Sequence, residues 1–324
     1  MVIEIMKWNV YGKIGVVSAL VIGGTIAGTS VFAKEKISQA EIEKFEMMAN
    51  VDALMRRQKA SFAGFEEFKK TIYKEPWEYG VYIVNGDTPI STDIELLDYF
   101  NGEIKADWKS TKFGVQLDSR IDKLTADAPD GYIVAWDNAK KRNLTYCVST
   151  TFGSLHDSVV DAVKEATGAW EKASDVKFIY RPEFDSACTN QTYSVVFDVR
   201  PVDVNREYLA RAFFPRYNRL QRSVLIDKSS FDLEPGNLTL TGILRHEFGH
   251  VLSFRHEHTR PEAGACFEDD RHIPLGDYDP FSVMHYPQCN GLGDWSLDLT
   301  KKDKKGAACI YGPGPETDAE TSCS

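Results

Sequence analysis

The chain has 324 residues, of which 38 are Lys or Arg and 48 are Asp or Glu, so its formal net charge is −10. Apolar residues make up 43% and charged residues 27%, which are the proportions of a soluble globular protein and exclude wholesale disorder, a collagen-like repeat and a multi-span membrane protein. The acidic balance argues against nucleic acid as a partner, because phosphate backbones select basic surfaces. The length accommodates about two domains.

The first 33 residues have the layout of a secretory signal. Lys7 and Lys13 precede an uncharged, largely apolar stretch over 14–33, in which Val31 and Ala33 stand at the small-residue positions that a signal peptidase requires. Cleavage after Ala33 predicts a secreted protein, extracellular or periplasmic, with no membrane contact once the signal is removed. The alternative is an uncleaved membrane anchor, since a stretch of this length can just span a bilayer.

Residues 34 to about 140 are expected to form a small, partly helical accessory domain or propeptide that contains no cysteine. The basic triplet 140–142 at its end is either a processing site or a solvated surface patch. Within this domain the sequence predicts a helix that starts from a capping box of Ser38 and Glu41 and continues to Met55, a strand over 80–84, a turn over 85–87 and a short helix over 93–100.

Residues 141–312 have a mixed pattern of strands and helices that predicts an α+β domain. The breaker Gly312-Pro-Gly-Pro then leaves 313–324 as an irregular tail. The expected elements are strands over 144–150, 176–180, 195–199, 208–214 and 224–226, a helix over 154–173 that buries Val159, Val160, Val163, Ala166 and Trp170, and a helix that begins near 239–241.

All six cysteines lie at or after position 147, and an even number in an exported chain indicates disulfides. Six cysteines allow 15 pairings, and the sequence alone does not choose among them. Proximity along the chain favours Cys147–Cys188, Cys266–Cys289 and Cys309–Cys323.

The segment from His246 to His256 carries the chemistry. On a helix, His246 and His250 are four residues apart, so their imidazoles project from one face and can bind one cation. Glu247 is rotated by about 100° and can act as a general base on a water held by the metal. His256 joins them only if the chain turns near Ser253. Three histidines leave a fourth position open, which is typical of a catalytic zinc site.

Two alternatives accompany this interpretation. The segment could be a solvent-facing helix with ordinary histidines, but six of the seven histidines fall within 40 residues, which argues against it. His258 could replace His256 as the third ligand if the turn were two residues longer.

The spacing His-Glu-x-x-His-x5-His, followed by Ser282-Val283-Met284-His285-Tyr286, resembles the metzincin clan of zinc endopeptidases. The strings over 254–260 and 282–286 look most like astacin-type members and related bacterial secreted metallopeptidases. The resemblance covers about 144–312. It implies a zincin fold with a twisted mixed sheet, an active-site helix and a small C-terminal subdomain across a substrate cleft. It also implies one catalytic Zn²⁺ and a protein or peptide substrate.

The resemblance implies roles for individual residues. His246, His250 and His256 would bind zinc, and Glu247 would be the base. Met284 would form an apolar floor beneath the imidazoles, unless it is an ordinary core methionine. Tyr286, a residue that can ligate zinc and stabilise the oxyanion in astacin-type enzymes, could instead be a tyrosine packed in the cleft. Glu257 would pair with the new N-terminus after processing, or is simply solvated. At position 253 the family usually has Gly in a left-handed turn, where Ser costs about 1 kcal/mol more.

The resemblance extends weakly to the accessory domain. Val84-Asn85-Gly86-Asp87 is similar to the Phe-x-Gly-Asp string of astacin-type pro-segments, whose aspartate occupies the open position of the zinc. Asp87 is therefore a candidate latency ligand, although Asn-Gly-Asp is also an ordinary hairpin turn.

These observations predict a secreted zinc-dependent endopeptidase made as a zymogen, with its substrate antiparallel to an edge strand within 208–214. The alternatives are a non-catalytic, zinc-stabilised extracellular binding protein, which would not need Glu247, and a membrane-tethered form of the protease. The acidic run 268–270 is either a calcium ligand set or an exposed acidic loop.

Overall fold

The computed structural model describes residues 64–77, 79–101, 124–129, 131–233, 236–266, 268 and 271–318. All of these residues belong to one compact unit, 56–324. The predicted signal and the helix predicted from Ser38 lie outside the described residues. Among the helices of the described part, none is both long and apolar enough to cross a membrane.

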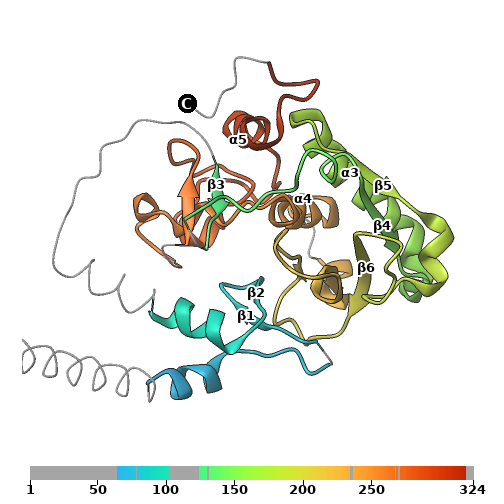
Figure 1. Ribbon diagram of the computed structural model, residues 1–324, viewed down its shortest axis with the longest axis horizontal. Helices are drawn as coiled ribbons and strands as arrows, with labels where there is room; N and C mark the ends of the chain where they lie inside the picture. The colour runs from blue at the N-terminus through green and yellow to red at the C-terminus, as the bar shows by residue number, and fades with distance from the viewer. Residues whose placement is uncertain are drawn as a thin grey trace, which may run out of the picture. The chain divides into compact units, whose positions relative to one another are not determined.

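A five-stranded mixed sheet forms the centre of the structure, in the order β5-β4-β6-β8-β7 (Figure 1). Neighbouring strands are parallel except at one edge, where β7 runs antiparallel to β8. This confirms the mixed sheet, and it confirms an edge strand within 208–214, although that strand is only two residues long. The strands are β4 (Leu144–Val148), β5 (Phe178–Tyr180), β6 (Phe197–Val202), β7 (Ala210–Arg211) and β8 (Ser223–Asp227).

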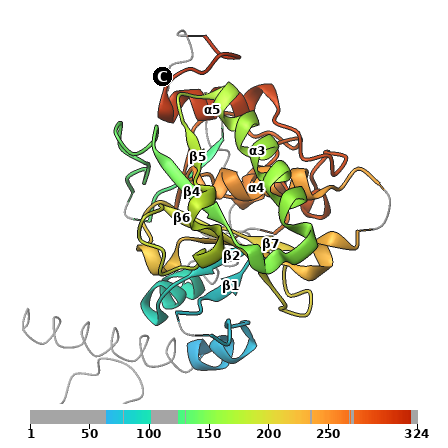
Figure 2. The same cartoon turned by 90° about the vertical axis from the view of Figure 1, so that its right-hand side faces the viewer.

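Helix α3 (His156–Ala173) packs against α4 (Leu240–Val251), and Figure 2 shows the two lying side by side. The five apolar residues predicted to face inward from α3 are all buried. Trp170 links the two helices, because its indole Nε1 donates to the carbonyl of Arg245 at 2.9 Å. The Thr239 side chain caps α4, as expected for a helix that begins near this residue.

Among the strands and α-helices described from Leu124 onward, three were not expected from the sequence. Strands β3 (Thr125–Asp127) and β9 (His272–Pro274) form a separate antiparallel pair, and α5 (Lys301–Tyr311) follows near the end of the chain. Strands of three residues are too short for an alternating pattern to appear. Helix α5 starts with four lysines among its first five residues, and its buried residues mostly follow them. It is held at its start by a capping box of Thr300 and Asp303.

The main hydrophobic core begins before the predicted domain boundary near residue 140. Leu124, Ala126 and Trp136 belong to the same buried cluster as Trp170. The indole Nε1 of Trp136 also donates to the carbonyl of Val251, the last residue of α4, at 2.8 Å. This packing favours a boundary ahead of Leu124, since residues from 124 onward complete the core of the larger domain.

The basic triplet 140–142 is neither a freely accessible cleavage site nor a fully solvated patch. Lys141 is buried, and its Nζ donates to the carbonyl of Tyr311 at 2.6 Å and lies 3.1 Å from Asp175. The guanidinium of Arg142 pairs with the same carboxylate. Tertiary contacts therefore hold two of the three basic residues in place.

The accessory segment has a small core of its own. Two helices, over 64–71 and 93–101, accompany a hairpin of β1 (Tyr82–Val84) and β2 (Thr88–Ile90). The strand predicted over 80–84 and the helix predicted over 93–100 are thus confirmed within a residue or two. The buried core residues of the segment are Phe65, Tyr82, Val84, Ile90, Leu96 and Tyr99.

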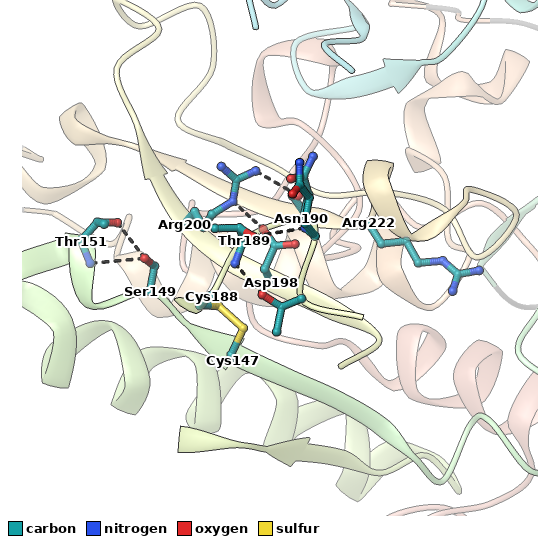
Figure 3. A network of polar contacts seen from close by, with 12 residues as sticks. Cys147, Ser149, Thr151, Cys188, Thr189, Asn190, Asp198, Arg200 and Arg222 are labelled. Atoms are coloured by element: carbon teal, nitrogen blue, oxygen red, sulfur yellow. Dashed lines mark hydrogen bonds and ion pairs between the residues drawn. A yellow bond between two sulfur atoms is a disulfide. The ribbon is translucent and has the colours of Figure 1, made fainter. Parts of the chain in front are cut away.

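Two of the predicted disulfides, Cys147–Cys188 and Cys266–Cys289, are confirmed. Cys309 is also disulfide-bonded, while its predicted partner, Cys323, lies outside the described residues. Figure 3 shows the first disulfide close to a buried polar network around Asp198 of β6.

Candidate metal centre

Helix α4 presents two histidines of the motif, His246 and His250, and both are buried. Gly249 lies between them along the chain, on a part of the helix that Met284 contacts closely. A Cβ atom at position 249 would lie 2.3 Å from the Met284 Sδ atom, so any larger residue would force the methionine side chain to move. Met284 itself is fully buried, which agrees with the floor position that was expected for it.

The chain turns directly after α4, as the motif required. Ser253 has a φ of 76°, in the left-handed region that favours glycine. Its backbone N–H donates to the carbonyl of His250 at 2.8 Å, which closes the turn. The turn brings His256 back, so that its Nε2 lies 3.2 Å from the Nε2 of His246. The predicted left-handed turn is confirmed.

Asp87 of the accessory segment lies among the three imidazoles. Its carboxylate oxygens are 3.2 Å from the Nε2 of His246, 3.6 Å from that of His250 and 3.1 Å from that of His256. The hydroxyl of Tyr286 donates to the same carboxylate at 2.5 Å. Asp87 is 4% exposed, so the carboxylate is removed from solvent.

The two interpretations of the Asn85-Gly86-Asp87 string are compatible. Asn85 and Gly86 have φ values of 53° and 91° and form the turn between β1 and β2. That turn carries Asp87 to the histidines. A Cβ atom on Gly86 would lie 3.2 Å from the Tyr286 hydroxyl oxygen, so the glycine also allows this close approach.

The hydrogen bonds of the ring Nδ1 atoms determine what the Nε2 atoms can do. Nδ1 of His246 lies 2.7 Å from the carbonyl of Val283, and Nδ1 of His250 lies 2.7 Å from the carbonyl of Phe254. A carbonyl oxygen only accepts, so each Nδ1 carries the proton. Burial also lowers the pKa of His250 to about 4, which keeps this ring neutral. The two Nε2 atoms therefore present lone pairs.

In neutral rings these lone pairs, together with the carboxylate that they face, can share one cation. The ligand atoms of Asp87, His246, His250 and His256 all lie within 4.8 Å of one another. Among the described residues, the Nε2 of His250 has no hydrogen-bond partner although it is buried. Three imidazoles and one carboxylate form a donor set suited to Zn²⁺, so the residues present fit such an ion.

Glu268 is a member of this site that was not expected from the sequence. One of its carboxylate oxygens, Oε1, accepts from the Nδ1 of His256 at 2.5 Å, and its other oxygen, Oε2, accepts from Arg255 at 2.8 Å. Burial lowers the pKa of His256, but Asp87 and Glu268 outweigh this effect and raise it to about 10. Two carboxylates thus flank this ring, Asp87 at its Nε2 and Glu268 at its Nδ1.

The prediction that Glu268 belongs to a calcium site or an exposed acidic loop is therefore wrong, because its side chain is 1% exposed and already bonded. The other two acidic residues of that run, Asp269 and Asp270, lie outside the described residues. The disulfide predicted for Cys266, two residues before Glu268, was the feature of the sequence that indicated an ordered loop here.

His258 does not join the three histidines around Asp87. Its ring stacks on His256 with centroids 4.6 Å apart, and its Nδ1 accepts from the backbone N–H of Tyr286 at 3.3 Å. His258 therefore packs against the ring of His256 and helps to hold it in place.

Glu247 is buried beside the histidines, and within the described part of the chain its Oε2 has no hydrogen-bond partner. Burial and the charge of Asp87 raise its pKa well above the ordinary value. Glu247, His246 and Tyr286 line a cavity of about 260 Å³ together with residues of the edge strand. A spare carboxylate oxygen beside a metal-binding cluster can accept a proton from a bound water.

Glu257 is not solvated. It is fully buried, accepts from the Thr125 hydroxyl at 2.8 Å and from Arg260 at 3.1 Å, and burial raises its pKa to about 8. Its backbone N–H donates to the carbonyl of Met284 at 2.8 Å, which joins the segment of the third histidine to the methionine turn.

Comparison with known proteins agrees with this site. A family model described as matrixin matches residues 135–263, which include the three histidines and Glu247. Tolloid-like protein 1 of Homo sapiens is 29% identical over 138 residues, a match that covers 40% of this chain and 11% of the relative. The match thus spans about a tenth of the length of that relative. Together the two similarities support a metzincin-type metallopeptidase with zinc as its metal.

Proposed function

We propose that the chain is a secreted zinc-dependent endopeptidase made as a zymogen, with astacin-type site residues. His246, His250 and His256 would hold the zinc, and Glu247 would be the general base. The observation that carries this proposal is the set of three Nε2 atoms around Asp87, next to a carboxylate oxygen of Glu247 that has no partner among the described residues.

Zinc in such a site would lower the pKa of a bound water to about 7 and polarise a peptide carbonyl. Glu247 would accept the proton of the attacking water and later deliver it to the leaving amine. Once Asp87 has departed, the Tyr286 hydroxyl loses its acceptor and can donate to the oxyanion that develops on the substrate.

The substrate would lie along β7. This strand has a sheet neighbour on one side only, so its other edge can pair with an extended peptide. Ala210 of β7 lines the same cavity as His246 and Glu247, which would place a peptide bond near both.

Latency would follow from Asp87. Its carboxylate occupies the space among the imidazoles that a catalytic water needs, and it also engages the Tyr286 hydroxyl. Activation then requires the segment that carries Asp87 to leave.

We place the maturation cut ahead of Leu124 and not at the basic triplet 140–142. Residues from Leu124 onward contribute to the main core, and Lys141 is buried. Thr125 lies against Glu257, so a cut shortly before Thr125 would bring the new α-amino group close to this buried carboxylate.

Export is supported by the N-terminal pattern of residues 1–33 and by the disulfides, which persist in oxidising compartments. N-terminal sequencing of the exported protein tests this part. A start at Lys34 is expected if the signal is cleaved, and an intact N-terminus would favour the membrane-tethered form.

Hydrolysis of casein by the matured protein tests the peptidase. Activity should vanish on treatment with a chelator and return with Zn²⁺. Glu247→Gln should lower activity by about 1,000-fold while the protein retains its zinc, because the base is lost and the ligands are not. A non-catalytic binding protein would bind zinc equally well and hydrolyse no casein in either form.

A further inference from the structure

A second carboxylate of the accessory segment, that of Glu75, lies against the edge strand. Its oxygens accept from the Nε and Nη2 of Arg211 on β7, at 2.7 Å each. The hydroxyl of Tyr208 donates to the same carboxylate at 2.9 Å. Glu75 and Arg211 are each 3% exposed and Tyr208 is 4% exposed. The carboxylate therefore fills a buried site in which Arg211 donates two hydrogen bonds and Tyr208 donates a third.

Arg211 makes its two shortest hydrogen bonds with Glu75. In the described residues, its Nε and Nη2 donate to Glu75 alone, while Nη1 makes only long contacts with the carbonyls of Ser223 at 3.3 Å and Ala212 at 3.4 Å. A guanidinium does not deprotonate in a protein, so loss of Glu75 would leave a buried charge without its two shortest hydrogen bonds. A site of this kind favours another carboxylate in place of Glu75.

The site adjoins the candidate metal centre. The residue before Arg211, Ala210, lines the cavity that contains His246 and Glu247. The residue after it, Ala212, donates a backbone hydrogen bond to Glu247. A peptide that pairs with β7 next to the metal would therefore pass within reach of Arg211.

We propose that Arg211 and Tyr208 form a carboxylate-binding site that Glu75 fills in the zymogen and that an acidic side chain of the substrate fills in the mature enzyme. The second half of this inference rests on the proposed peptidase function. The substrate class is an extended peptide with Asp or Glu at one position. The accessory segment thus carries two carboxylates, Asp87 at the metal centre and Glu75 at the edge strand.

Chemical rescue of the full chain tests the site without any need for catalysis. Glu75→Ala removes the carboxylate and leaves space for a small ligand, so the melting temperature should fall. Propionate, which has the end group of a glutamate side chain, should restore it at millimolar concentration. Propionamide, which has the same shape and no charge, and chloride at equal ionic strength should not.

Arg211→Met in the Glu75→Ala background is the matched control, and propionate should have no effect on this double variant. Equal effects of propionate and propionamide, or rescue that persists in the double variant, would overturn the carboxylate site. Lys69→Gln, which breaks an ion pair within the accessory segment far from Arg211 in sequence, should leave the propionate response of Glu75→Ala unchanged.

Cleavage of paired peptides tests the substrate. Peptides that differ only by Glu or Gln at successive positions are offered to the matured wild type and to matured Arg211→Gln. At one position, Glu should raise kcat/KM of the wild type by about 10-fold or more, and Arg211→Gln should lose this preference. Cleavage without an acidic preference overturns the substrate half alone. Rescue by propionate without cleavage of any peptide supports the site and contradicts the peptidase proposal.

Discussion

Two buried aspartates, Asp87 and Asp198, have opposite surroundings. Asp198 is fully buried and accepts from the Nε of Arg200 at 2.6 Å and from Arg219 at 2.7 Å, which are permanent donors (Figure 3). Asp87 faces the Nε2 atoms of three histidines, two of which carry their protons on the opposite nitrogen. A carboxylate among arginine donors completes a structural network, whereas a carboxylate among three imidazole nitrogens forms a ligand set suited to a metal ion. The kind of partner around the buried carboxylate therefore distinguishes the metal-binding cluster from the structural one.

The largest expected effect is on latency. Asp87→Ala should raise the hydrolytic activity of the unprocessed full chain by about 100-fold or more, because a tethered ligand no longer blocks the metal centre. Hydrolysis of a fluorogenic peptide before processing measures this. Asp93→Ala is the matched control, since Asp93 belongs to the same segment and pairs with Lys69 away from the site. Equal activity of Asp87→Ala and wild type would show that Asp87 is only a turn residue.

The structural aspartate should respond in stability and not in metal binding. Asp198→Ala leaves Arg200 and Arg219 without their shared partner and should lower the free energy of unfolding by about 3 kcal/mol. Urea denaturation measures this loss, while the dissociation constant for Zn²⁺ should stay as in the wild type. Asp203→Ala, which breaks an exposed ion pair with Lys228, should change stability by less than about 1 kcal/mol. A weaker zinc affinity in Asp198→Ala would contradict the assignment of Asp198 to a purely structural network.

Glu268 should behave as part of the metal centre through its contact with His256. Glu268→Gln removes the charge that orients His256 and should weaken Zn²⁺ binding by about 10- to 100-fold. Competition with a chromophoric chelator measures the affinity. The control is Glu262→Gln, since the Glu262 side chain is 52% exposed and pairs with Arg260. An unchanged zinc affinity in Glu268→Gln would show that Glu268 has a structural role and does not contribute to zinc binding.

The smallest effect is expected at the turn. Ser253→Gly should raise the free energy of unfolding by about 1 kcal/mol, because glycine adopts the left-handed conformation without strain. The substitution also removes a buried hydroxyl that has no partner among the described residues. Ser253→Ala separates the two causes, since alanine removes the hydroxyl and keeps the strain. If alanine stabilises the protein as much as glycine does, the hydroxyl and not the backbone is responsible.

Much of the candidate site could be predicted from local spacing. The four-residue separation of His246 and His250 places both on one face of α4, and the need for a turn near Ser253 follows from the distance to His256. The proximity-based disulfides of Cys147 and Cys266 were also correct. The histidine positions follow from the helix period, and each of these disulfides joins two cysteines that are consecutive in the sequence, 41 and 23 residues apart.

The remaining features depend on contacts between distant segments. Neither the 12-residue separation of His256 and Glu268 nor the 136-residue separation of Glu75 and Arg211 produces a recognisable pattern. Likewise, nothing in the basic triplet 140–142 indicates that Lys141 is buried beside Tyr311. Charged residues usually lie at the surface, so the sequence favours solvated interpretations for all of them.

The sequence by itself determined the histidine motif, the helix that carries it and the turn after it, because backbone geometry sets the direction of neighbouring side chains. Only the tertiary structure decided which carboxylates meet those histidines and which residues before 140 complete the main core. Those outcomes depend on how the hairpin of β1 and β2, the loop at Glu268 and the strand at Thr125 pack together, and packing depends on the shape and charge of surfaces that are remote in sequence.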